Sequence, residues 1–139
     1  MRVLDADTLT HLYAGHERVI GCLRRCEDPD VAIAVVTKAE ILRARCDALL
    51  KAADAEQLLR AQSRFLQTER LLNELRTVAF DERATTEFLR LRARTALRKI
   101  GHIDLLLAAL ALANRATLVT RNLRHFNQVP NLNLENWVD

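Results

Sequence analysis

Short apolar runs alternate with longer segments of helical periodicity along the whole sequence. The runs lie at residues 2–5, 31–36, 77–80, 117–120 and 132–134. Apolar runs of this length, with little polar alternation, are typical of strands in a buried parallel sheet. Because the runs alternate with helical segments, we expect an α/β fold with right-handed crossovers.

The segments between these runs predict helices. We expect them at residues 8–14, 17–25, 38–50, 55–75, 82–99 and 104–114, with a helical turn at 122–126. Thr37 and Glu40 have the spacing of a capping box, which predicts that a helix begins at residue 38. The segment 104–114 is apolar on nearly all sides, so we expect that helix to be buried.

The length of 139 residues predicts a single domain over residues 1–139. No apolar stretch approaches the roughly 18 residues of a membrane span, and no signal-peptide pattern begins the chain. We therefore expect a soluble, cytoplasmic protein without a membrane partner. Three cysteines fit no closed set of disulfides, so we expect three small buried hydrophobic residues. The three glycines form no glycine-rich turn after the first strand, which excludes a Rossmann dinucleotide site.

Four acid or amide side chains lie at the ends of apolar runs that are far apart in the sequence. Asp5 closes the first run, Glu40 follows the second by one helical turn, Asp104 opens the apolar helix, and Asn122 follows the run 117–120. In an open parallel sheet the carboxyl ends of the strands border one crevice, so these side chains should meet there. Carboxylate and amide oxygens are the ligands that Mg²⁺ and Mn²⁺ take. The pattern therefore predicts a divalent-cation site.

These motifs resemble the PIN domain, in particular the VapC-type ribonuclease toxins of bacterial toxin–antitoxin pairs. The matching segments occur in the family's order at residues 4–8, 32–40, 103–109, 116–122 and 126–137. Each motif is short, but together they span essentially the whole chain. The resemblance implies a PIN-like three-layer α/β/α fold around a central, mostly parallel sheet of four to five strands.

The resemblance also implies roles for the four candidate residues. Asp5, Glu40 and Asp104 correspond to the core acidic residues with which the family holds Mg²⁺ or Mn²⁺, and Asn122 stands where the family has an acid or an amide. Such a site is expected to hydrolyse RNA phosphodiester bonds with a metal-activated water. Each acid taken alone has a structural alternative as a helix-capping residue.

Two further positions depart from the family's common pattern. Asp7 stands where the family often has Asn, and His102 where an additional acid is frequent. We regard both as candidate accessory residues of the site. Their structural alternatives are a bond from Asp7 to backbone amides at the helix start, and a solvated loop position for His102.

The positive charge of the chain is almost entirely arginine. The formal net charge is +3, and the cations comprise 18 arginines and 3 lysines. The planar guanidinium matches phosphate geometry, so we expect Arg121 and Arg124, beside Asn122, to guide RNA toward the acids. Aromatic residues are only 4% of the chain, so base stacking should not dominate recognition.

The resemblance implies a cognate antitoxin as a protein partner. The helix expected at 55–75 has apolar positions beyond one narrow stripe, which predicts a homodimer or antitoxin contact, with core packing as the alternative. Two other functions stay open. The chain could be an RNA-processing PIN nuclease without an antitoxin, or a non-cleaving PIN-fold module that binds RNA or protein.

Overall fold

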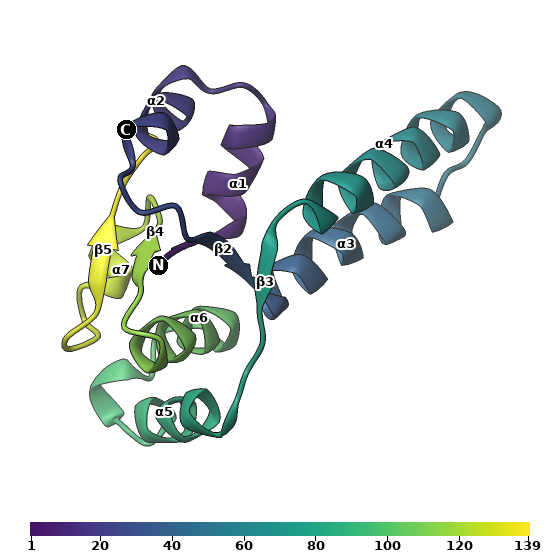
Figure 1. Ribbon diagram of the computed structural model, residues 1–139. Helices are drawn as coiled ribbons and strands as arrows, with labels where there is room; N and C mark the ends of the chain where they lie inside the picture. The colour runs from purple at the N-terminus through teal and green to yellow at the C-terminus, as the bar shows by residue number, and fades with distance from the viewer.

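Five short parallel strands form the centre of the structure, a computed structural model that describes residues 1–139 (Figure 1). The strands are β1 (Arg2–Leu4), β2 (Val31–Ala34), β3 (Arg76–Val78), β4 (Thr117–Val119) and β5 (Asn133–Glu135). Their order in the sheet is β3-β2-β1-β4-β5, and every pair is parallel. The register places Val3 of the central strand beside Ala32 on one side and Leu118 on the other.

Helices connect all the strands and cover both faces of the sheet. They are α1 (Ala6–Tyr13), α2 (Glu17–Arg25), α3 (Val35–Leu50), α4 (Ala55–Asn73), α5 (Glu82–Arg92), the 3-10 helix η1 (Thr95–Leu97), α6 (His102–Ala113) and α7 (Leu123–Phe126). Figure 1 shows α1 and α2 on one side of the sheet and α5 and α6 on the other. In the same view, α3 and α4 form a hairpin that projects from the rest of the molecule. The expected three-layer α/β/α fold is confirmed.

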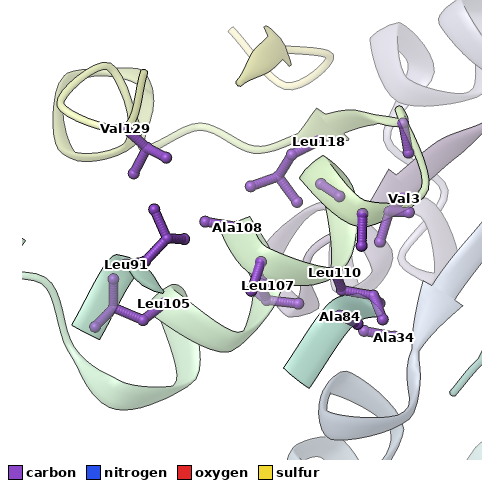
Figure 2. Packing of buried hydrophobic residues seen from close by; sticks show 14 of the residues in the cluster. Val3, Ala34, Ala84, Leu91, Leu105, Leu107, Ala108, Leu110, Leu118 and Val129 are labelled. Carbon is purple, nitrogen blue, oxygen red and sulfur yellow. The ribbon is translucent and has the colours of Figure 1, made fainter. Parts of the chain in front are cut away.

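Alternate side chains of the three inner strands, β2, β1 and β4, enter two separate hydrophobic cores. Val3 and Leu118 belong to a cluster of 19 buried residues under α5 and α6, part of which Figure 2 shows. Their chain neighbours Leu4 and Val119 point the opposite way, into a cluster of 8 buried residues that also contains Trp137. Successive strand side chains alternate between faces, so a strand covered on both sides must be apolar throughout. This explains why the strand sequences show no polar alternation.

Helix α6 fills the larger core, as its composition predicts. Seven of its residues are buried, including Leu107, Leu110 and Ala111. Figure 2 shows Leu107 and Leu110 close to Ala84 of α5. The helix begins at His102, two residues earlier than expected, with Gly101 as its N-cap. Asp104 is thereby placed in the first helical turn.

The boundary between β2 and α3 differs from the sequence prediction. The strand ends at Ala34, which is the N-cap of α3, and the helix begins at Val35. The predicted capping box is wrong, because Thr37 lies inside the helix, is fully buried, and its Oγ1 has no hydrogen-bond partner. Burial of this side chain in the tertiary structure overrides the local capping signal.

Two smaller expectations also need correction. The helix expected to reach residue 99 ends at Arg92, and the chain then turns through η1 so that Leu97 and Ile100 enter the larger core. The three cysteines are free thiols, as predicted, but they are only half-buried; Cys22 and Cys26 pack against the edge of the smaller core. None of the helices combines the length and the apolar sequence needed to cross a lipid bilayer.

Candidate active site

A hollow of about 540 Å³ lies at the carboxyl ends of β1 and β4. It is lined by Asp5, Asp7, Asp104, Thr120, Arg121, Asn122, Phe126 and Asp139. Strands β1 to β3 proceed to one side of the sheet and β4 and β5 to the other, so the hollow lies where the strand order reverses. Ligands of open α/β sheets bind at such switch points. The fold thus brings Asp5, Asp7, Asp104 and Asn122 to one place.

Asp5 is fixed between the two central strands. Its N–H donates to the carbonyl oxygen of Val119 (3.1 Å), and its Oδ1 accepts from the N–H of Thr8 (2.8 Å) as the N-cap of α1. The hydroxyl of Thr8, buried, donates to the same Val119 oxygen (3.2 Å). The capping role therefore holds, but it uses only one carboxylate oxygen. Oδ2 of Asp5 has no protein partner and is free for a ligand.

Asp104 is the acid of the hollow whose pKa is raised. It lies in the first turn of α6, and its Oδ2 is 3.1 Å from Nε2 of His125. Burial raises the pKa of Asp104, and the charge of Asp5 raises it further, whereas the hydrogen bond and charge of His125 act in the opposite direction. Asp5 and Asp104 therefore repel each other across the hollow.

Arg121 ties together the rim of the hollow. Its Nη1 lies 3.7 Å from Oδ2 of Asp7, and its Nη2 lies 3.3 Å from Oδ1 of Asp139. Hydrogen bonds from Asn136 and Arg121 lower the pKa of Asp139, and the same bond to Asp139 raises the pKa of Arg121. Asn122 is exposed beside it, and its N–H donates to Oγ1 of Thr120 (3.0 Å). The rim is therefore a mixed-charge surface.

Comparison with protein families decides how this arrangement is classified. The model of the PIN domain family matches residues 2–132, which is nearly the whole chain. This chain belongs to the PIN domain family. The resemblance read from the sequence motifs is confirmed.

Individual proteins that resemble this PIN domain include matches at 20% to 41% sequence identity. Ribonuclease VapC2 of Rickettsia felis is 41% identical over 68 residues, which are 48% of this chain and 51% of the relative. The alignment thus spans about half the length of that curated protein. A structure of VapBC2 from Rickettsia felis bound to a promoter DNA fragment matches with a TM-score of 0.76 and 27% identity, covering 98% of each chain. VapBC-1 from nontypeable Haemophilus influenzae matches in fold, with a TM-score of 0.75 at 20% identity over 99% of this chain and 98% of its own.

Three predicted residues of the PIN domain do not line the hollow. Glu40 is exposed on α3 and makes no side-chain hydrogen bond or ion pair. His102 is exposed at the start of α6, where its ring packs edge-on against Phe88 with 5.4 Å between centroids. Arg124 is exposed on α7 without a side-chain partner. His102 is thus the first residue of α6 rather than a loop residue and has a packing contact, while the side chains of Glu40 and Arg124 have no partner.

The sequence analysis missed two residues of the site. His125 follows Asn122 by three positions, so one turn of α7 brings it beside the hollow, and this spacing is the only local signal for it. Asp139 follows the last strand without any motif, and its place on the rim depends on the pairing of β5 with β4. Neither position could be assigned without the tertiary structure.

The oxygen donors of the hollow fit a hard divalent cation. Asp5, Asp104 and Asn122 offer carboxylate and amide oxygens, and a cation would favour the ionised form of Asp104, whose pKa is raised chiefly by burial and further by the charge of Asp5. No three His, Cys, Asp or Glu side chains have the spacing of a complete metal site. The hollow therefore offers a partial ligand set, which suits Mg²⁺ because that ion usually keeps several of its waters.

Proposed function

We propose that this PIN domain, as a single unit over residues 1–139, is a VapC-type endoribonuclease that hydrolyses RNA phosphodiester bonds with the help of Mg²⁺ or Mn²⁺. The observation that carries the proposal is the meeting of Asp5 and Asp104 at the switch point of the sheet, with the pKa of Asp104 raised partly by the charge of Asp5. The family membership and the ribonuclease name of the 41% identical relative support it.

The proposal gives each residue of the hollow a definite task. Asp5 and Asp104 bind the cation through their free carboxylate oxygens, and Asn122 adds its amide oxygen. A bound ion lowers the pKa of a coordinated water and offsets charge that develops on the phosphoryl group. Glu40 is the proposed third acid from α3, and its exposed carboxylate is unhindered by any protein partner. Asp7 instead holds Arg121 in place.

The two arginines beside the hollow differ in what they can offer RNA. Arg121 is paired with Asp7 and Asp139, so part of its charge is already neutralised. Arg124 has no such partner and is exposed on the same short segment. Both are proposed phosphate contacts, with Arg124 contributing the larger share because its charge is not shared with acids.

A cognate antitoxin is the proposed protein partner. Several similar solved structures are toxin–antitoxin complexes, among them one from Klebsiella pneumoniae. In this chain a groove of about 300 Å³ between α1, α3 and α4 combines apolar side chains such as Tyr13 and Ile41 with Arg45 and Arg64. Apolar and cationic groups side by side suit an amphipathic protein segment. We place the antitoxin contact there.

A homodimer is the proposed assembly of the chain. Leu50, Leu59 and Leu66 are large apolar residues that are exposed on the projecting α3–α4 hairpin, and Leu50 and Leu59 are 83% and 65% exposed. Such a group on one element indicates a protein contact more than a solvated surface. A second copy of the chain would remove these leucines from water.

The deciding experiment is cleavage of total cellular RNA by the purified protein with Mg²⁺ or Mn²⁺. The controls are EDTA and Asp5→Asn, which keeps the N-cap of α1 and removes the charge. We expect discrete fragments that disappear in both controls, whose mapped ends identify the cleaved sequence. Folded protein that binds Mn²⁺ but leaves every RNA intact would refute the nuclease and favour a binding module. Growth arrest on expression alone, relieved by the product of a neighbouring gene, would support the toxin role over an RNA-processing role.

A further inference from the structure

We propose that His125 is a positioning residue, which holds the carboxylate of Asp104 in the orientation that binds the divalent cation. The inference rests on the proposed function, because it concerns how that same site is organised. It assigns a role to a histidine that no sequence motif indicated.

The contact between the two side chains is short and direct. Nε2 of His125 lies 3.1 Å from Oδ2 of Asp104, and the side chains are 24% and 36% exposed. At this distance Nε2–H donates a hydrogen bond to the carboxylate. The bond occupies one oxygen of Asp104, whose Oδ1 has no protein partner. A single fixed donor therefore defines which oxygen is available to a ligand.

The backbone that carries the imidazole is held by hydrogen bonds, and its ring has one aromatic contact. The N–H of Phe126 donates to the carbonyl oxygen of Asn122 (3.2 Å), and the side-chain amide of Gln128 donates to the carbonyl oxygen of His125 (3.2 Å). The ring meets the buried ring of Phe126 edge to face, with 5.7 Å between centroids. Because Phe126 is anchored in the larger core, His125 has a fixed base from which to hold Asp104.

The electrostatics of the hollow explain why Asp104 needs such a partner. Asp5 and Asp104 are both acidic. Arg121 acts on Asp5 through its charge without forming an ion pair with it, and His125 is the only basic side chain paired with Asp104. Without the hydrogen bond, repulsion favours rotation of the Asp104 side chain away from Asp5. Groups that hydrogen-bond to metal ligands keep them oriented, and their loss typically weakens metal binding 10- to 100-fold.

The chain offers a matched control for this role. His102 lies two residues before Asp104 in α6, but its ring packs against Phe88 and does not line the hollow. Replacing either histidine removes an imidazole from the same region of the protein. Only His125 contacts a carboxylate of the site, so only its loss should alter metal binding.

The test is Mn²⁺ binding to the metal-free protein, measured by calorimetry for wild type, His125→Ala, His125→Gln, His102→Ala and Asp104→Asn. We expect His125→Ala to weaken binding roughly 10-fold. His125→Gln, whose amide N–H can still donate to Asp104, should recover most of the affinity, and His102→Ala should bind as wild type does. In RNA cleavage, His125→Ala should raise the Mn²⁺ concentration needed for half-maximal rate more than it lowers the rate at saturating Mn²⁺.

Three results would contradict the proposal or the metal site on which it rests. Wild-type Mn²⁺ affinity in His125→Ala, together with weak binding in Asp104→Asn, would remove the positioning role and leave the proposed function intact. Unchanged affinity in Asp104→Asn would instead remove the metal site itself. Equal losses in His125→Ala and His125→Gln would also contradict the inference, because the glutamine retains the hydrogen-bond donor.

Discussion

Asp5 shows how one side chain can serve the fold and the site together. Its Oδ1 caps α1 through Thr8, and its Oδ2 remains free in the hollow. The position after β1 requires a residue that can cap a helix, and the proposed chemistry requires a negative charge. Aspartate meets both requirements, whereas asparagine meets only the first.

Paired substitutions of Asp5 should separate these two roles. Asp5→Asn keeps a good N-cap, so its free energy of unfolding in urea should equal that of wild type, while Asp5→Ala should lose about 1 kcal/mol. Both variants should lose RNA cleavage, since each removes the carboxylate. Cleavage by folded Asp5→Asn at the wild-type rate would mean that the charge of Asp5 takes no part in the reaction.

The ionised carboxylate of Asp104 should lower the free energy of unfolding at neutral pH. Its pKa is raised in the folded state, so the ionised carboxyl is less favourable there than in the unfolded chain. Asp104→Asn should therefore have a higher Tm than wild type at pH 7 in EDTA. The gain should shrink as the pH falls toward the ordinary aspartate value of about 3.9, where the carboxyl becomes protonated in both states.

Thermal melts of the two proteins between pH 7 and pH 4 would measure this difference. An Asp104→Asn Tm below that of wild type across the range would show that the bond from His125 to a charged carboxylate outweighs burial. Added Mn²⁺ should reverse the order, because a ligand that binds only the native state stabilises it, by about 2.7 kcal/mol at 100 times Kd.

Element types were predictable from the sequence, and some element ends were not. The sequences of the three inner strands β2, β1 and β4 are mostly apolar because both sheet faces are covered there, so the sequence signal and its structural cause coincide. The start of α3 lacked a signal, since Ala34 makes no side-chain capping bond and the valines at 35 and 36 favour a strand locally. Within the site, Asp5 follows β1 directly and Asn122 comes three residues after the end of β4, so both were predictable, whereas His125 depends on a helical turn that brings it to Asp104.

The apolar helix α6 should dominate the stability of the fold. Leu110 is fully buried in the larger core, so Leu110→Ala should lower the free energy of unfolding by about 2–5 kcal/mol. Leu89→Ala on α5 is the control, because this leucine is 54% exposed and its loss should change stability by less than about 0.5 kcal/mol. Equal effects of the two substitutions in urea denaturation would contradict the assigned packing of α6.

At the scale of the whole molecule, the hollow joins the two outer layers of the fold. Asp5 is the N-cap of α1, which covers one face of the sheet, and Asp104 lies in the first turn of α6, which covers the other. The α3–α4 hairpin projects away from this junction and carries the exposed leucines (Figure 1). Apart from Glu40, which is on α3, the residues proposed for cleavage lie outside this hairpin, so cleavage and assembly should respond to different substitutions.

The hairpin should determine the oligomeric state. Leu59→Glu and Leu66→Glu together should convert a dimer into a monomer in light scattering coupled to gel filtration, because a charge replaces apolar contact area on α4. Leu89→Glu, on an equally exposed residue of α5, should leave the mass unchanged. A wild-type protein that is monomeric at all concentrations would contradict the proposed assembly.

The sheet order has a consequence for the moment at which the protein becomes active. β1 is the first strand to be synthesised, yet one of its two neighbours is β4, and their pairing joins Val3 to Leu118. This pairing cannot form before both strands have been synthesised, and β4 ends at residue 119 of 139. A ribosome must therefore translate nearly the whole message before Asp5 meets Asn122, and a chain that terminates early carries Asp5 and Glu40 without a site. The proposed nuclease would therefore be unable to cleave its own messenger RNA until synthesis of the chain is almost complete.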